Sequence, residues 1–135
     1  MVETLHIRVN KQGLHSITTQ VEQLVQRENL DSGLCTLFIR HTSASLLIQE
    51  NADPSAKYDL ENWLNRLVPE NDSLYTHTME GPDDMPAHIK CALTATSLSI
   101  PIVAARLALG TRQGIYLWEH RHTSAVRDLV VHISE

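Results

Sequence analysis

The strongest constraint on the fold of this chain is the order in which strand-like and helix-like apolar patterns follow one another. Alternating or continuously apolar strand patterns occur at 2–9, 34–39, 46–48, 97–103, 106–109, 115–119 and 126–133. Helical spacing of apolar residues occurs between them, at 17–29, 56–67 and 84–93. Strands and helices do not alternate strictly, so the order predicts a single α+β domain over residues 1–135, with a mostly antiparallel sheet and about three helices.

Local signals set the ends of these elements. The clearest amphipathic stripe lies at 56–67, after the chain break at Asp53-Pro54-Ser55 and before Pro69. The last two strand patterns predict a hairpin through 122–124, and Pro101 predicts an edge or a bulge in its strand.

The stretch Glu80–Lys90 packs three carboxylates, a histidine and a lysine into eleven residues. Its helix should start with Asp84 as N-cap and bury its apolar positions, which are Met85, Ile89 and Leu93. A helix start exposes unpaired N–H groups and a positive dipole end, so acidic residues there serve either as caps or as part of a site.

Composition excludes several classes of protein. The net charge is −5 and the basic residues are scattered, which argues against nucleic acid as a partner. No apolar run reaches the roughly 20 residues of a membrane span, so no membrane contact is expected. Cys35 and Cys91 stand apart in apolar surroundings and are predicted to be reduced core residues, which favours a cytoplasmic location.

Histidines form the most informative chemical pattern. Four of them lie where apolar elements give way to polar loops: His41, His77, His88 and His120. Imidazole is the commonest metal ligand, and nearby carboxylates (Glu50, Glu80, Asp84 and Glu119) suit ligands or their orienting partners. A single histidine of this kind is more often structural, and no HEXXH or paired CxxC spacing supports zinc by itself. His6, His15, His122 and His132 are interpreted as structural. No GxSxG elbow frames Ser43 or Ser45 as a nucleophile.

Four longer motifs carry a resemblance. They are His41-Thr42-Ser43-Ala44-Ser45-Leu46, Glu50-Asn51-Ala52-Asp53-Pro54, the stretch 80–90, and the stretch 109–121 that contains Trp118-Glu119-His120-Arg121. In this order they resemble the motifs of the YjbQ-like family, which is linked to secondary thiamine-phosphate synthase activity. The resemblance covers nearly the whole chain.

The resemblance implies a sandwich-like fold that assembles as a homotrimer, with a site near subunit boundaries and histidines that hold a divalent metal ion such as zinc. Residue by residue, it implies functional positions at His41, Glu50, Asp84, His88, Lys90, Gln113, Glu119, His120 and Arg121. This sequence departs from the family pattern at Arg112, where an aromatic residue is usual, and at Ala95 and Ala105, where glycine is frequent.

Two hypotheses about function follow. In the first, the chain is a metal-dependent enzyme that joins a pyrimidine methyl pyrophosphate to a thiazole phosphate and releases pyrophosphate, as its main or as a side activity. In the second, it is a non-enzymatic trimer that binds a metal or another small ligand. Metal analysis followed by turnover assays with and without a chelator distinguishes them.

The sequence also predicts how the site is built. His41, His88 and His120 should converge on one metal ion, with His77 as a fourth or substitute ligand. Asp84 and Glu119 should orient ligands or transfer protons, and the remaining catalytic candidates are Glu50, Lys90, Gln113 and Arg121. Apolar residues on both faces of the strand at 34–39 predict a surface that contacts another subunit.

Overall fold

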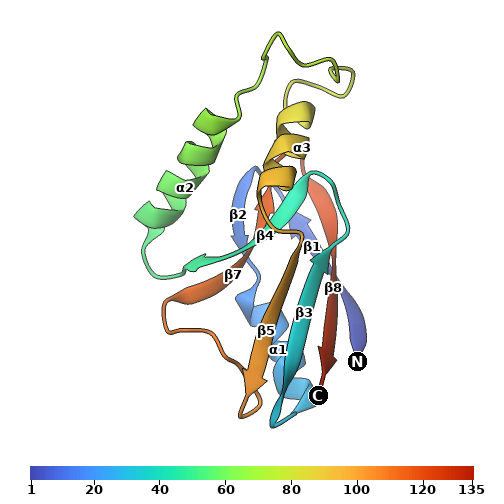
Figure 1. Ribbon diagram of the computed structural model, residues 1–135, viewed down its shortest axis with the longest axis vertical. Coiled ribbons are helices and arrows are strands. Elements are labelled where there is room, and N and C mark those ends of the chain that lie inside the picture. The colour runs from blue at the N-terminus through green and yellow to red at the C-terminus, as the bar shows by residue number, and fades with distance from the viewer.

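The computed structural model describes residues 1–135, which form three helices and eight strands (Figure 1). In chain order these are β1 (Val2–Val9), β2 (Gly13–Ser16), α1 (Thr18–Glu28), β3 (Ser32–Ile39), β4 (Ala44–Glu50), α2 (Pro54–Leu67), α3 (Asp84–Leu93), β5 (Ser97–Val103), β6 (Arg106–Leu107), β7 (Gln113–Glu119) and β8 (Ala125–Ser134). None of the three helices is both long and apolar enough to cross a membrane.

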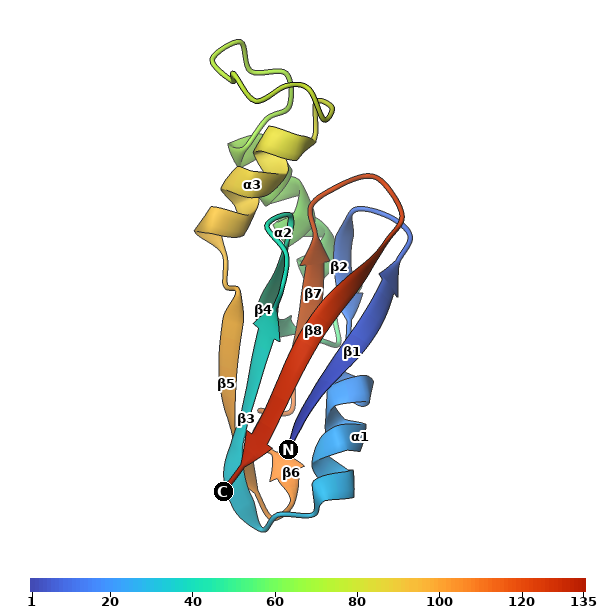
Figure 2. The same ribbon diagram turned by 90° about the vertical axis from the view of Figure 1, so that its right-hand side faces the viewer.

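The strands form two antiparallel sheets. The larger has the order β1-β8-β3-β5-β6 and the smaller has the order β2-β7-β4. Figure 2 shows the larger sheet from outside, with the smaller one behind it and α2 and α3 at one end of the molecule. The prediction of an α+β fold with an antiparallel, sandwich-like arrangement is confirmed.

The main core lies between the two sheets. It holds 19 buried residues from strands of both sheets and from α1, and nearly all are aliphatic. In β8, for example, Leu129, Val131 and Ile133 point inward while the residues between them face outward. This period-2 alternation places one face of each strand in the core. Helix α1 adds Val21, Leu24 and Val25 against β6, β7 and β8.

A second, smaller core lies between α2 and the other face of the three-stranded sheet. Leu64 and Val68 pack there against Tyr116 and Trp118 of β7. Strand β7 is therefore buried on both faces, because α2 covers the side that the main core does not. The predicted stripe of α2 is only partly used, since Trp63 and Leu67 remain about half exposed.

The structure corrects several predicted elements. β7 and β8 do not form a hairpin: they belong to different sheets, because β7 pairs with β2 and β4 while β8 pairs with β1 and β3. Strand β2 was not predicted, since its four residues are too few to show a period. β4 is longer than predicted and β6 is shorter.

The face that helix α3 buries differs from the predicted one. The helix begins at Asp84, with Asp83 at the N-cap position and without a side-chain cap bond. Leu93 is 59% exposed, while Asp84, Ala87, Lys90 and Cys91 are buried. Arg121 contacts the buried carboxylate of Asp84, and Asn65 of α2 accepts from the buried ammonium of Lys90, so polar contacts as well as apolar packing set the orientation of this helix.

Candidate metal site

A buried carboxylate begins α3. The side chain of Asp84 is only 3% exposed, although it lies in the first turn of the helix. The preceding loop turns at Gly81, whose φ of +107° is a conformation that glycine adopts without strain. The unpaired N–H groups of a helix start stabilise a negative charge there, so the position suits an ionised carboxylate.

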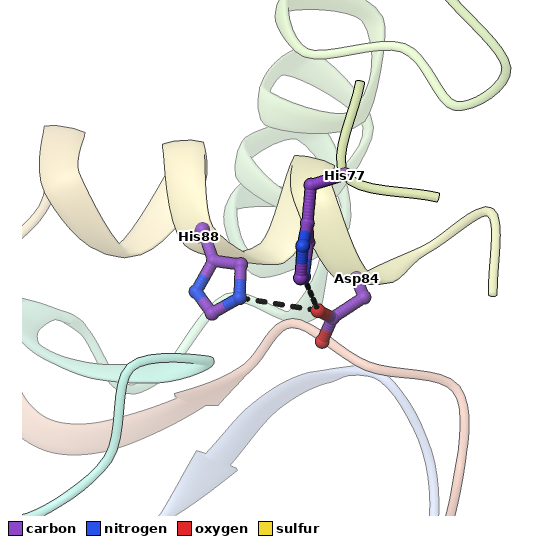
Figure 3. Close-up of side chains that lie close together, drawn as sticks. All are labelled: His77, Asp84 and His88. Carbon is purple, nitrogen blue, oxygen red and sulfur yellow. Dashed lines mark hydrogen bonds and ion pairs between the residues drawn. The ribbon is translucent and has the colours of Figure 1, made fainter. Parts of the chain in front are cut away.

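Two histidines approach the same oxygen of this carboxylate. His77 Nε2 lies 2.6 Å from Asp84 Oδ2, and His88 Nε2 lies 3.1 Å from it. Figure 3 shows His77 descending from the loop before α3, with His88 one helical turn after Asp84. The three donor atoms lie within 4.8 Å of one another, and the two imidazole rings are 5.3 Å apart. The geometry of these three side chains is compatible with a metal ion held between them.

Arg121 holds the other oxygen of Asp84. Its Nη1 donates to Asp84 Oδ1 at 2.7 Å, and its Nε and Nη2 donate to the two oxygens of Asp83, each at 3.2 Å. Burial alone would raise the pKa of Asp84, but the hydrogen bond from His77 and the charge of Arg121 outweigh it, so the pKa lies below its usual value. Asp84 is therefore ionised and fixed in direction.

His88 faces two acceptors at once. Its Nδ1 lies 3.1 Å from the carbonyl oxygen of Thr42, and its Nε2 faces the Asp84 carboxylate. A neutral imidazole has a single N–H and cannot donate to both. Either a second proton or a metal ion between Nε2 and Oδ2 satisfies both sides. With Nδ1–H donating to a carbonyl, Nε2 has the orientation that metal-bound histidines usually have.

The expected convergence of His41, His88 and His120 is not found within the chain. His41 Nε2 already accepts a hydrogen bond from the Asp128 amide at 2.8 Å, and its Nδ1 lies 3.4 Å from Arg127. Burial, and after it the charge of Arg127, lowers the pKa of His41. Because the Asp128 amide already occupies Nε2, this nitrogen of His41 is not available to a metal ion within the chain.

His120 lies on another side of the structure. It follows β7, where successive side chains point to opposite faces, so His120 shares the face of Trp118 that α2 covers. Its Nε2 lies 2.9 Å from the hydroxyl of buried Ser45, a contact that the sequence did not indicate. Burial, with the charges of Lys90 and Arg127, lowers the pKa of His120 to about 3, so this imidazole is neutral.

Glu119 is completely buried on the opposite face of β7. Arg127 contacts both of its oxygens, with Nη2 at 2.6 Å from Oε2. The same Oε2 accepts from the backbone N–H of Arg121 at 2.9 Å. Glu119 thus fixes the residue that in turn fixes Asp84, and it does not reach the histidines of the site itself. Arg127 was not predicted, because it lies outside all four motifs.

Lys90 points away from the His77–Asp84–His88 group. Its ammonium donates to Asn65 of α2 at 2.6 Å, whereas His88 faces Thr42. Residues two apart on a helix are separated by about 200° around the axis, which accounts for this divergence. Burial lowers the pKa of Lys90.

Glu50 and Gln113 lie at the far end of the three-stranded sheet. They pair with each other across β4 and β7, at the end opposite to Glu119. A strand of seven residues spans about 20 Å, so neither side chain reaches the metal-binding group of its own chain. Glu50 instead pairs with Arg112, and Gln113 accepts from the Gly110 amide. Within one chain, the predicted site residues therefore fall into separate places.

Comparison with known proteins gives a consistent result. A family model described as UPF0047 protein YjbQ-like matches residues 3–135. A UPF0047 protein of Synechocystis, sll1880, is 52% identical over 98% of this chain and 90% of the relative. UPF0047 protein YjbQ of Escherichia coli O157:H7 is 40% identical over 95% of this chain and 93% of the relative.

Solved structures share the fold. A conserved hypothetical protein of Thermus thermophilus, TT1486, superposes with a TM-score of 0.87 at 32% identity, covering 98% of this chain and 99% of the other. A YjbQ/UPF0047 family protein of Clostridium acetobutylicum gives a TM-score of 0.86 at 33% identity, covering 99% of each chain.

Proposed function

Because this chain belongs to the YjbQ-like UPF0047 family, we propose that it is a metal-dependent enzyme acting on a small phosphorylated substrate. One observation carries the proposal: His77, Asp84 and His88 present three donor atoms within 4.8 Å of one another at the start of a helix. Two imidazoles and a carboxylate are a ligand set of catalytic zinc sites, which leave a further position open for substrate or water.

The surroundings of the group suit such a role. Asp84 is buried, but the side chains of His77 and His88 are 43% and 33% exposed, so the group opens to solvent on the histidine side. A recess of about 270 Å³ adjoins His77, and another of about 330 Å³ adjoins His88. A divalent metal ion here would supply a Lewis acid for a phosphate oxygen.

The chain's own residues then have defined tasks. Arg121 holds Asp84 in place through Oδ1 and leaves Oδ2 for a cation. Thr42 orients His88 through its carbonyl oxygen. Glu119 fixes the backbone of Arg121. Arg121 and Thr42 each restrict the rotation of one side chain of the group, and Glu119 acts through Arg121. Residues around a metal site raise its affinity in this way.

The specific reaction that the family resemblance implies is thiamine-phosphate synthesis with release of pyrophosphate. Three carboxylates, those of Glu80, Asp83 and Asp84, lie close together in the sequence at the start of α3, and they repel a pyrophosphate unless a cation lies between them. The reaction is therefore expected to depend on the metal. We place this activity in the cytoplasm, in keeping with the two free cysteines.

We further propose a homotrimer. The outer face of the five-stranded sheet carries exposed apolar side chains: Val2, Leu34, Phe38, Val103 and Val126. No helix of the chain covers this face (Figure 2), and exposed apolar side chains on an uncovered face favour a contact with another subunit. A recess beside Phe38 shares His41, Thr42 and Thr96 with the recess beside His88, so a subunit bound on this face would lie next to the site.

One observation favours the alternative of a non-enzymatic metal-binding trimer. Arg121, which contacts the group through Asp84, already donates to both Asp83 and Asp84 and to the carbonyl of Glu80. It has little capacity left for a substrate. In that case the group holds a metal without turnover.

The experiment begins with elemental analysis of the purified protein and titration with Zn²⁺, followed by synthase assays with and without chelator. We expect one metal per chain and activity that chelator removes and Zn²⁺ restores. His77→Ala and His88→Ala should lose the metal, while the control His15→Ala should keep it, because the imidazole of His15 hydrogen-bonds to the carbonyl of Lys11 and not to any residue of the group.

Outcomes separate the two proposals. Metal bound without turnover supports the binding protein, and turnover unaffected by chelator contradicts the metal-dependent enzyme. Light scattering tests assembly, with an expected mass three times that of the 15.2 kDa chain. Phe38→Glu should yield monomers, and a wild-type mass of one chain would contradict the trimer.

A further inference from the structure

A separate polar cavity lies beneath α2, away from the metal-binding group. Its volume is about 140 Å³. The floor is formed by three buried side chains, Lys90, Trp118 and His120. The rim is polar and comes from α2 and from the residues around the start of β2: Gln12, Gly13, Tyr58, Glu61, Asn62 and Asn65.

Lys90 is the unusual feature of this cavity. The residue is 2% exposed, yet its ammonium donates only one hydrogen bond, to the neutral amide oxygen of Asn65 at 2.6 Å. No carboxylate forms an ion pair with it: Glu70 and Asp83 act on it only over longer range. An ammonium has three N–H donors, so two of them have no partner within the chain.

A buried charge without a paired opposite charge is costly, and proteins normally compensate it with a carboxylate or a ligand. The other floor residues do not compensate it, because His120 is neutral and the Trp118 indole can only donate. What the cavity lacks is an anionic acceptor facing Lys90.

Glu61 does not supply that acceptor. Its Oε2 is engaged by the backbone N–H of Leu14 at 2.7 Å on the rim. Gly13 permits this approach, since a Cβ at that position would lie 2.2 Å from the same oxygen. The carboxylate is thus held toward β2, on the rim of the cavity and outside ion-pair distance of Lys90.

We propose that this cavity binds a small oxyanion, a phosphate or a short carboxylate, whose oxygens accept hydrogen bonds from Lys90. The size agrees, because a cavity of about 150 Å³ holds a molecule the size of benzene. The side-chain amide of Asn62 at the rim offers N–H donors for the remaining oxygens, whereas the amide of Gln12 already donates to the carbonyl oxygen of His120 at 3.1 Å.

This site is distinct from the proposed metal site. Lys90 and His88 leave α3 on different sides, one toward Asn65 and the other toward Thr42. The proposal therefore goes beyond the proposed function and holds whether or not a metal binds. It gives Lys90 the role of anchoring an anion, where the sequence had grouped it with the residues around the histidines.

Isothermal titration calorimetry of the full-length protein tests the proposal, with inorganic phosphate and acetate as separate titrants at constant ionic strength. We expect saturable binding of at least one anion, and the two titrations identify which. Lys90→Met removes the charge at similar volume and should weaken binding at least about 10-fold. Circular dichroism verifies the fold of each variant.

Two isosteric variants sharpen the result. Asn65→Asp supplies Lys90 with a carboxylate where the amide oxygen stands, so it should abolish anion binding while Lys90 remains. Glu61→Gln removes a negative charge from the rim and should tighten binding. His77→Ala is the matched control, because it disrupts the metal-binding group but leaves the cavity intact.

The proposal is overturned if wild type binds neither anion, or if Lys90→Met and Asn65→Asp bind as tightly as wild type. Loss of binding in His77→Ala alone would place the anion at the metal site instead. Since metal binding is measured separately, a failure of this proposal does not affect the metal-dependent function, and the reverse is also true.

Discussion

Two arginine–glutamate pairs at opposite ends of β7 have the same chemistry and different surroundings. Arg127 forms an ion pair with Glu119 inside the sandwich, where the Arg127 side chain is 10% exposed and the Glu119 side chain 0%. Arg112 donates three hydrogen bonds of 2.9–3.1 Å to Glu50, and here the Arg112 side chain is 65% exposed and the Glu50 side chain 20%. Both glutamates were predicted to be catalytic, and both are occupied by an arginine.

The comparison shows that burial decides what such a pair does. In water, an ion pair contributes little because solvent screens it and competes for it. Inside the protein, losing one partner leaves an uncompensated charge. The buried pair thus holds the end of β7 and the backbone of Arg121 in place, whereas the exposed pair joins two loop ends. The first and last of the four predictions below test this contrast, and the two between them test the residues around the buried pair, from the largest expected effect to the smallest.

Arg127→Met should cost the most. It leaves Glu119 buried without its cation, which typically reduces the free energy of unfolding by about 3–5 kcal/mol. Urea denaturation monitored by tryptophan fluorescence measures the change. The double variant Glu119→Leu/Arg127→Met is the control and should recover much of the loss. A single variant as stable as wild type would show that burial does not make this pair important.

Substitutions at Asp84 and Arg121 should affect metal binding next most strongly. Asp84→Asn removes a proposed ligand and is expected to weaken Zn²⁺ affinity by more than about 100-fold, beyond the roughly 10–100-fold typical of an orienting partner. Arg121→Lys keeps the charge but loses the two-pronged contact, so its loss should lie within that smaller range. Competition with a chromogenic chelator measures both. An equal loss in the two variants would contradict the distinction between ligand and orienting residue.

His120, which follows the buried end of β7, should make the stability of the fold sensitive to acid. Its pKa is about 3 in the folded protein and near 6.5 when exposed, so the unfolded chain binds a proton first as the pH falls. The associated stability is fully present above pH 6.5 and is lost between pH 6.5 and about 3, by on the order of 1 kcal/mol per pH unit. When the free energy of unfolding is measured as a function of pH, it should depend less on pH in His120→Gln than in wild type. Parallel curves would contradict it.

Arg112→Ala should change least. The side-chain hydrogen bond from Arg112, followed by the Ala52 amide, lowers the pKa of Glu50, but both side chains meet solvent. We expect no resolvable change in the denaturation midpoint at about 0.15 M salt, where exposed charges are screened. Arg112→Tyr, which restores the aromatic residue usual in the family, should behave the same way. A large destabilisation by either variant would remove the contrast between the two pairs.

Much of the fold was predictable because apolar periodicity is a local property. Helix α2 begins after Asp53, which accepts from the Ser55 amide as an N-cap, and α1 ends at Asn29 in the left-handed conformation, as its turn residues indicated. The alternation in 97–103 and 126–133 also gave strands β5 and β8. Which strands pair is a non-local choice, so the division of β7 and β8 between two sheets was not visible.

The sequence by itself determined the supply of site residues: the motifs, the family, and the spacing of Asp84 and His88 one turn apart on a helix. That i, i+4 spacing puts both on one helix face wherever the helix packs. Only the tertiary structure decided that His77, from an irregular loop, joins them, and that His41 and His120 turn elsewhere. The physical reason is that helix geometry fixes directions within a turn, whereas loop and strand-end side chains take the direction of whichever partner the packed fold brings near.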